Sequence, residues 1–449
     1  MDKTVMGLRI LVLSLWLGGT MFAGAQEVGD TIVLHALGDA LSYAEDHNVQ
    51  RSIYAAQELK AKAEHHISKS YLLPSAVGSF SAQNNLKLAT TPIPGELVGR
   101  PGEQIDVQFG RDYSYNAGIT ISQTVLDWQK AMQSRELKLG REIAGVQADI
   151  YTEKLTEQVV FYYFTALIAR RALEINERDL QLADSIRTLS IQKFDRGLVD
   201  KPSLNQAEIN FNNVRQSLYS NQIAFDRAVN QLKEFMGLDE TVELLMEESY
   251  RFADHGFDVP MDLEKDGNIT LWELQLEQSE LRVREQRSNY YPKLTFTAYF
   301  GQQQFQDGFT FSLDGEQWTD YSYLGANLTV PIFTGLANRN KIKASKIDRA
   351  IARMNLENET KRSRLRDDLL LREYELGLYA SSTAHSNFML YKDNLELAFQ
   401  QYQEGILALD SYFRVFEDYL KAENGYLSAL SNLYNQYATI FSRKKDYGQ

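Results

Sequence analysis

The stretch KFDRGLVDKPSLNQAE, residues 193–208, interrupts one of the longest helical patterns in the chain. No proline occurs between residues 129 and 194, but this stretch contains Gly197 and, five residues later, Pro202. Glycine readily adopts the positive φ that ends a helix, and proline is tolerated in the first turn of one. The stretch therefore predicts that a long helix ends here and reverses into a second helix, which Asp200 caps.

The same turn occurs a second time, about 208 residues later. Self-similarity at a fixed period indicates a duplicated architecture. Two pairs of segments share an offset of 207 or 208: QKFDRGLV (192–199) with QQYQEGIL (400–407), and ITISQTVLDW (119–128) with ANLTVPIFTG (326–335). A third pair, SYLLPSAVGSFSAQ (70–83) with NYYPKLTFTAYFGQ (289–302), has its prolines offset by 218, because the segment after Pro74 is about ten residues longer than its counterpart.

Each repeat is expected to contain the same series of elements: an amphipathic helix, a β-hairpin and a long helical hairpin. The first repeat is 26–235, with a helix over about 36–70, strands over about 75–127 and a helical hairpin over 129–235. The second is 268–449, with a helix over 268–289, strands over about 293–333 and a helical hairpin over 336–445. An irregular acidic connector, 236–267, joins them.

The helical stretches carry an apolar repeat typical of helices packed side by side. The stretch before Gly197 has apolar side chains at steps of four and three: Leu155, Val159, Tyr162, Ala166, Ala169, Leu173, Leu180 and Ala183. At about 1.5 Å per residue such helices approach 100 Å. The predicted fold class is mainly α with a small β part, in an extended bundle.

The strand-like stretches alternate apolar and polar residues, which predicts a sheet with two different faces. Loops rich in Gly, Asp, Asn and Pro connect the strands, over 85–112 and 306–320. Six aromatic residues near the loop-side ends suit the aromatic girdle of an outer-membrane barrel: Tyr113, Tyr115, Tyr299, Trp318, Tyr321 and Tyr323. Ordinary tyrosines of a soluble β-sandwich are the alternative.

The N-terminus predicts export. Lys3 and Arg9 precede a short apolar run that ends in a small-residue site at 23–25, so residues 1–25 are expected to be a signal peptide.

A net charge of −13 argues against nucleic acid as a partner, and no cysteine is present. No P-loop, GxSxG or dinucleotide motif occurs, so we expect neither an enzyme nor a cofactor, and no metal site.

In its whole order of motifs the chain resembles the TolC-type outer-membrane channel family. The resemblance extends from about Ala36 to Phe441 and includes the Tyr-Leu-Pro-Ser segment and the Gly-Leu-Val turn. It implies a homotrimer whose twelve strands, four per chain, form a transmembrane β-barrel in the outer membrane. The helices would form an α-barrel tunnel through the periplasm. An inner-membrane transporter and a periplasmic adaptor (membrane fusion) protein are the implied partners, in efflux or type I secretion.

In that family the two glycine turns are the periplasmic tips of the helical hairpins. The resemblance therefore assigns adaptor docking at the tunnel tip to eight residues: Phe194, Gly197, Leu198, Val199, Tyr402, Gly405, Ile406 and Leu407. Asp410 is the expected cap of the second return helix, and in the first repeat Ser203 with Gln206 offers a rival capping box.

The family's acidic gate does not carry over. The best-known member has two acidic residues at the second tip, where this chain has Ser411 and Arg414. Asp200 and Asp410 are the alternative sources of charge at the entrance, and Arg414 could pair with Glu417 or Asp418. An exported coiled-coil structural or adhesion protein, without channel activity, is the rival function.

Overall fold

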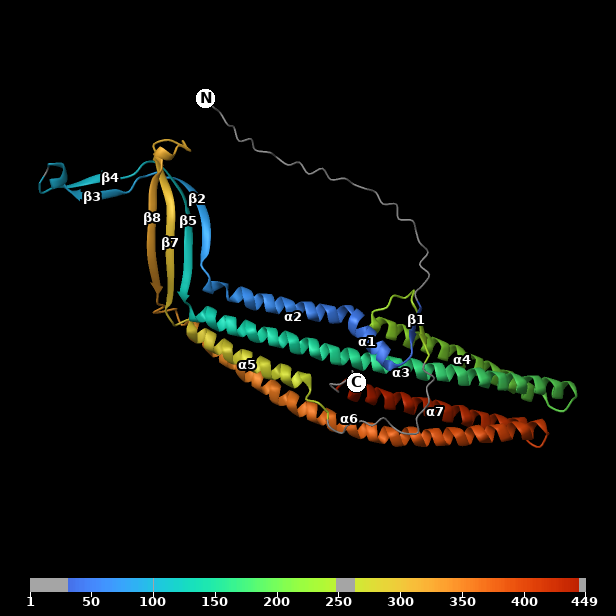
Figure 1. Ribbon diagram of the computed structural model, residues 1–449. Helices are drawn as coiled ribbons and strands as arrows, with labels where there is room; N and C mark the ends of the chain where they lie inside the picture. The colour runs from blue at the N-terminus through green and yellow to red at the C-terminus, as the bar shows by residue number, and fades with distance from the viewer. Residues whose placement is uncertain (1–30, 100, 248–262, 444–449) are drawn as a thin grey trace, which may run out of the picture.

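The computed structural model describes residues 31–99, 101–247 and 263–443, so the expected signal peptide and the middle of the connector lie outside the described residues. The described chain is long and narrow, with a β-sheet at one end and two helical turns at the other (Figure 1). No described helix contains an apolar stretch long enough to span a bilayer.

Two helices of about 100 Å dominate the structure: α3 (Trp128–Asp195), with 68 residues, and α6 (Ala337–Gln403), with 67. Each reverses into a return helix, α4 (Lys201–Met236) after α3 and α7 (Leu409–Ser442) after α6. The predicted helical hairpins are therefore present in both halves of the chain.

Shorter helices cover the sheet-side half of each long helix. The helix α5 (Gly267–Ser288) packs along α6, as α2 (Val49–Ser68) packs along α3 (Figure 1). The prediction of one helix over about 36–70 was wrong in detail, because α1 (Leu37–His47) ends before α2 begins. Asn48 separates the two: its Oδ1 accepts from the Arg51 N–H at 3.0 Å, and its Nδ2 donates to the Phe235 carbonyl at 2.9 Å. Such side-chain bonds to backbone compete with a continuous helix.

The two predicted β-hairpins join into one antiparallel sheet in the order β2-β5-β7-β8. Its strands are β2 (Ser75–Asn84), β5 (Tyr113–Leu126), β7 (Lys293–Gln306) and β8 (Thr319–Thr329). Strand β5 leads into α3 through Asp127 alone, whose Oδ1 accepts from the N–H groups of Gln129 and Lys130. Sheet and helix are thus joined without a flexible linker.

Two segments predicted as irregular contain strands. Within the 85–112 loop, β3 (Thr90–Pro94) and β4 (Gln104–Gln108) form a hairpin that projects from the main sheet (Figure 1). In the connector, β6 (Glu243–Met246) pairs in parallel with β1 (Thr31–Leu34) beside α1. The two prolines of β3 favour a loop, and the four-residue strands β1 and β6 do not alternate strictly, so the sequence pattern did not identify either pair. Short 3₁₀ turns occur at Ser70–Leu72, Gly95–Val98 and Gly315–Gln317.

The core follows the middle of the bundle, where α3 contacts α4 and α7. The predicted apolar seam of α3 lies in it, with Leu155, Val159, Ala166 and Ala183 buried and the other members half-buried. The helix α7 contributes large aromatic side chains to the same core, among them Tyr412, Phe416 and Tyr437. Aromatic packing between hairpins therefore holds the described chain together.

Candidate functional site

The two hairpin tips, residues 194–200 and 402–408, lie at the end of the molecule farthest from the sheet (Figure 1). Gly197 and Gly405 have φ values of 72° and 78°, as the sequence predicts. The next N–H donates back across each turn, Leu198 to the Lys193 carbonyl and Ile406 to the Gln401 carbonyl, both at 2.9 Å. This is the Schellman arrangement, which satisfies carbonyls at a helix end.

The return helices start differently in the two repeats. The Asp200 Oδ1 accepts from the Ser203 N–H at 3.0 Å, so Asp200 caps α4, and these bonds hold the pKa of its carboxyl below the ordinary value. The prediction that Asp410 caps α7 was wrong, because the helix begins at Leu409 with Ala408 in the cap position. Asp410 lies inside the first turn, where a negative charge still favours the helix dipole.

A contact between the tips joins the two hairpins. Tyr402 is buried, and its carbonyl accepts from the Lys193 Nζ at 2.8 Å while its hydroxyl lies 3.1 Å from the Ser190 Oγ. Burial lowers the pKa of Lys193 and raises the pKa of Tyr402. Tyr402 therefore contributes to packing inside the tip, and its ring is not exposed for contact with a partner.

The apolar residues of the tips divide into two kinds. Leu198 is 69% exposed and Ile406 is 72% exposed, so each turn projects one apolar side chain into solvent. Val199 is half-buried, and Leu407 packs against the core. Phe194 is also half-buried, with the Lys201 Nζ 5.4 Å from its ring centroid. The outward surface of the tips is thus smaller than the sequence suggests.

The candidate gate charges are not brought together by any described ion pair. Asp200, Asp410 and Arg414 are all exposed. Asp418, expected as a partner of Arg414, pairs with Lys421 at 3.4 Å. Among the described residues, no group of three His, Cys, Asp or Glu side chains could hold a metal ion.

The main sheet has one apolar face, which we call the outer face. Its exposed members come from all four strands: Phe80, Ile119, Ile121, Phe296, Phe300, Leu324 and Leu328. The band from Leu294 to Phe300 measures about 20 Å along β7. The opposite face carries Thr120, Thr297, Asn327 and similar polar residues. A broad exposed apolar face marks a surface that meets another molecule or a lipid.

The six aromatic residues predicted as one girdle lie on different faces. Tyr299, Tyr321 and Tyr323 form a ring cluster on the polar face. Tyr299 is one position from Phe300 on β7, and Tyr323 is one position from Leu324 on β8, and successive strand residues point to opposite faces. Grouping those three with the outer face was wrong.

Tyr113, Tyr115 and Trp318 do gather at the loop end of the outer face. The loop after β7 folds back onto this end, where Phe311 contacts the rings of Tyr115, Phe80 and Trp318. Gln304 holds the loop, because its Oε1 accepts from the Ser312 N–H at 3.3 Å. Phe309 and Phe311 were not among the predicted aromatic residues, because they are spaced by two in a loop that shows no strand pattern.

No known family profile matches the chain, and no curated protein matches it either. Solved structures do match. The Campylobacter jejuni CmeC outer membrane channel superposes with a TM-score of 0.72 at 19% identity, over 91% of this chain and 85% of that one. The Neisseria gonorrhoeae MtrE outer membrane channel, in its open state, gives 0.69 at 16% identity, over 91% and 88%. The outer membrane protein VceC from Vibrio cholerae gives 0.66 at 15% identity, over 90% and 93%.

These similarities cover both the sheet and the helical hairpins, and they confirm at the level of the fold the resemblance that the sequence motifs indicate. The chain has the fold of the TolC-type outer-membrane channels.

Proposed function

We propose that the protein is a passive outer-membrane channel-tunnel for efflux or type I secretion, located in the outer membrane with its helices in the periplasm. The observation that carries the proposal is the outer face of the sheet, which is apolar, exposed and continuous with helices about 100 Å long. A structural protein made only of coiled-coil helices has no need for an exposed apolar sheet face.

The open edges of the sheet favour a homotrimer. Strands β2 and β8 each pair on one side only among the described residues, and open sheet edges are not tolerated in lipid. Four strands are also too few for a closed bacterial barrel, which needs at least about eight. Three copies supply twelve strands, so β8 of one copy would pair with β2 of the next.

The hairpin tips are the proposed docking surface for a periplasmic adaptor protein, which connects the tunnel to an inner-membrane transporter. Leu198 and Ile406 are the two strongly exposed apolar side chains there. Three copies would place six such side chains in a ring. Isolated exposed apolar residues are common, but a ring of them marks an interface.

Two measurements test the channel. The protein should fractionate with outer membranes and require detergent for extraction, and the purified trimer should raise the conductance of a planar lipid bilayer. Extraction by a salt wash as a water-soluble monomer would contradict the proposal and favour a structural or adhesion protein. Insertion without conductance would show a closed or non-conducting assembly, which contradicts the passive duct.

A further inference from the structure

Five polar side chains meet where the first helical hairpin contacts the second. Four of them are buried, Asn176 and Asp179 on α3 and Tyr419 and Glu423 on α7, and the fifth, Asn221 on α4, is half-buried. The Asn176 Nδ2 donates to the Glu423 Oε1 at 3.0 Å, and the Tyr419 hydroxyl donates to the Asp179 Oδ1 at 3.1 Å. The Asn221 Nδ2 donates to the Asn176 Oδ1 at 2.6 Å. This polar cluster connects three helices across the apolar core.

The two acids of the cluster are incompletely compensated. The Asp179 Oδ2 and the Glu423 Oε2 are buried, and neither receives a hydrogen bond as long as both carboxyl groups are ionised. Neither residue takes part in any of the ion pairs found in the described chain. Two adjacent carboxylates without a cation are costly to bury, because desolvation and mutual repulsion both disfavour the charged forms.

A shared proton removes most of this cost. Burial raises the pKa of Glu423 first, and the charge and hydrogen bond of Asp179 raise it further. Burial also raises the pKa of Asp179, while hydrogen bonds from Glu423 and Tyr419 work in the opposite direction. These two directions favour a neutral Glu423 beside an ionised Asp179, an arrangement in which the Glu423 carboxyl is the donor and the Asp179 carboxylate is the acceptor.

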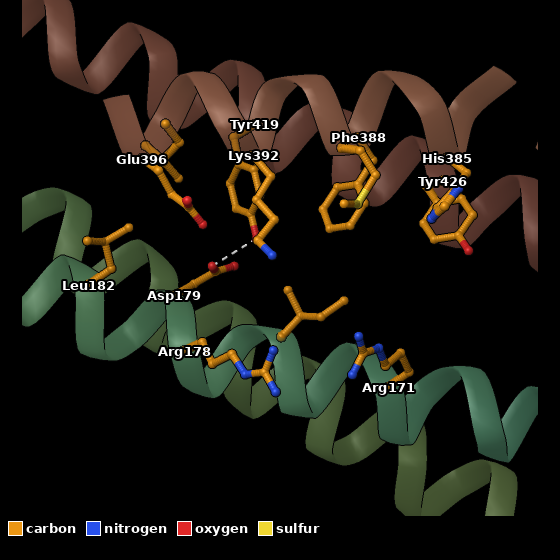
Figure 2. A pocket seen from close by; sticks show the side chains of 13 residues that line it. Arg171, Arg178, Asp179, Leu182, His385, Phe388, Lys392, Glu396, Tyr419 and Tyr426 are labelled. Atoms are coloured by element: carbon orange, nitrogen blue, oxygen red, sulfur yellow. Dashed lines mark hydrogen bonds between the residues drawn. The ribbon is translucent and has the colours of Figure 1, made fainter. Parts of the chain in front are cut away.

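A cavity of about 500 Å³ opens beside Asp179, between α3, α6 and α7 (Figure 2). The titratable and charged groups that line it are Arg171 and Arg178 from α3, His385, Lys392 and Glu396 from α6, and Tyr419 and Tyr426 from α7. Tyr412 of α7 also lies within electrostatic range of Asp179, and the contact from α4 is the neutral Asn221. Arg171 is already paired with Glu174 at 2.8 Å. The cavity gives solvent and protons a route to the cluster.

We propose that Asp179 and Glu423 form a proton-dependent latch that holds α3 against α7 and loosens when Glu423 loses its proton. Asp179 lies 16 residues before the end of α3, and Glu423 lies 14 residues after the start of α7, so the latch is roughly 20 to 25 Å from both tips. Loosening it would let the two hairpins separate near the tips. Control of the tunnel by this movement rests on the function proposed above.

The direction of the pH effect follows from the raised pKa of Glu423. The folded chain holds this proton more tightly than the unfolded chain does, so the contribution to stability is complete below the ordinary carboxyl pKa. That contribution is lost as the pH rises through the raised pKa. The latch is therefore closed in acid and neutral solution and loosens on the alkaline side.

Distance measurements between spin labels test the latch. The chain has no cysteine, so Gln181→Cys on α3 and Asn387→Cys on α6, both exposed, give two unique label positions in the full-length protein. The distance should lengthen by several ångströms and broaden between about pH 6 and about pH 10. Glu423→Gln, which cannot ionise, should keep the short distance throughout. Glu373→Gln, an exposed change of the same charge on α6, should respond as the wild type does.

An unchanged distance in the wild type, or the same lengthening in Glu423→Gln, would overturn the latch. If Glu423→Gln does not fold, Asp179→Asn replaces it, because removing the neighbouring charge should lower the pKa of Glu423 and move the transition to lower pH. A protein that conducts in bilayers but shows no change in distance would contradict the latch alone. A protein that shows the change but never conducts would contradict the channel and leave the latch supported.

Discussion

Leu336 is the one non-glycine residue of the described chain with a positive φ, 65°. It lies at the start of α6, just after the sheet, and its side chain is exposed. A side chain in this conformation costs about 1–2 kcal/mol, because Cβ crowds the following carbonyl. The first repeat avoids the strain, since Asp127 there enters α3 from an extended conformation. The two repeats therefore connect sheet to helix differently.

Replacing Leu336 with glycine should relieve this strain, whereas alanine should keep it. We expect Leu336→Gly to be more stable than Leu336→Ala by about 1 kcal/mol, since both lose the same exposed side chain. Chemical denaturation of the two detergent-solubilised variants measures the difference. Equal stability, or a more stable alanine variant, would show that the positive φ stores no strain.

The residues of the hairpin tips show which local features the sequence could predict. The positive φ of Gly197 and Gly405 and the cap by Asp200 followed from residue type and spacing alone. The prediction that Asp410 caps a helix failed because Asp410 lies five residues after Gly405, whereas Asp200 lies three residues after Gly197. Burial of Tyr402 depends on contacts with α3, more than 200 residues away, and local spacing carries no such information.

Among the elements, β8 gives the sharpest test of the lipid-facing sheet. Leu324 lies on the outer face and is 82% exposed, while Asn327 lies on the polar face of the same strand. In lipid, Leu324→Lys should destabilise the folded protein by about 2–4 kcal/mol, and Asn327→Lys should have little effect. Heat resistance of the trimer on electrophoresis and its yield in outer membranes report the loss. Equal tolerance of both substitutions would show that the outer face meets water.

The hairpin tips give a separate prediction. Leu198→Asp combined with Ile406→Asp should abolish export and capture of the adaptor, because two apolar side chains of each docking surface become charged. Bilayer conductance and trimer formation should remain at wild-type levels, since both side chains are mostly exposed. Asp410→Asn serves as a nearby control outside the apolar pair. Full export by the double variant would exclude these side chains from docking.

The face of each strand residue was predictable, but the position of the loop was not. Alternation already places Tyr299 opposite Phe296 and Phe300, so assigning it to the girdle conflicted with the pattern itself. The fold-back of Phe311 onto Tyr115 depends on side-chain packing of a loop, which follows no period. In the same way, alternation predicted two hairpins, and only the structure shows that β5 and β7 unite them.

For the whole molecule, Arg443 connects distant parts of the chain near its middle. Its side chain is 9% exposed and pairs with Asp367 of α6 and with Glu153 of α3, and it donates to the Glu264 carbonyl. Burial raises the pKa of Glu153 to about 7, and Arg443 acts against that rise. Three segments, α3 of the first repeat, the connector and α6 of the second repeat, therefore converge on one guanidinium.

Arg443→Ala should destabilise the protein by about 2 kcal/mol, because it leaves two half-buried acids, Asp367 and Glu153, without their cation. Without Arg443 the pKa of Glu153 in the folded protein should rise further above its value in the unfolded chain. The loss of stability relative to the wild type should therefore grow as the pH rises through about 7, where Glu153 gives up its proton. Thermal unfolding across a pH series measures both effects. Lys421→Ala, which breaks the exposed pair with Asp418, should change stability by less than about 1 kcal/mol. A uniform effect of Arg443→Ala at every pH would exclude Glu153 from the contact.

Closure of the sheet between copies can be tested by disulfide cross-linking, because the chain has no native cysteine. Ser79→Cys on β2 would be combined in turn with cysteine at Tyr321, Tyr323 and Gly325 on β8, all on the polar face. One register should bring the sulfur atoms of neighbouring copies within bonding range and give a covalent species of three chains. Ser75→Cys with Ser122→Cys, which face each other within one chain, should stay monomeric on denaturing gels. Since each copy has one β2 edge and one β8 edge, a ring of three leaves no edge unpaired, whereas a coiled-coil protein with a small sheet would give no cross-link in any register.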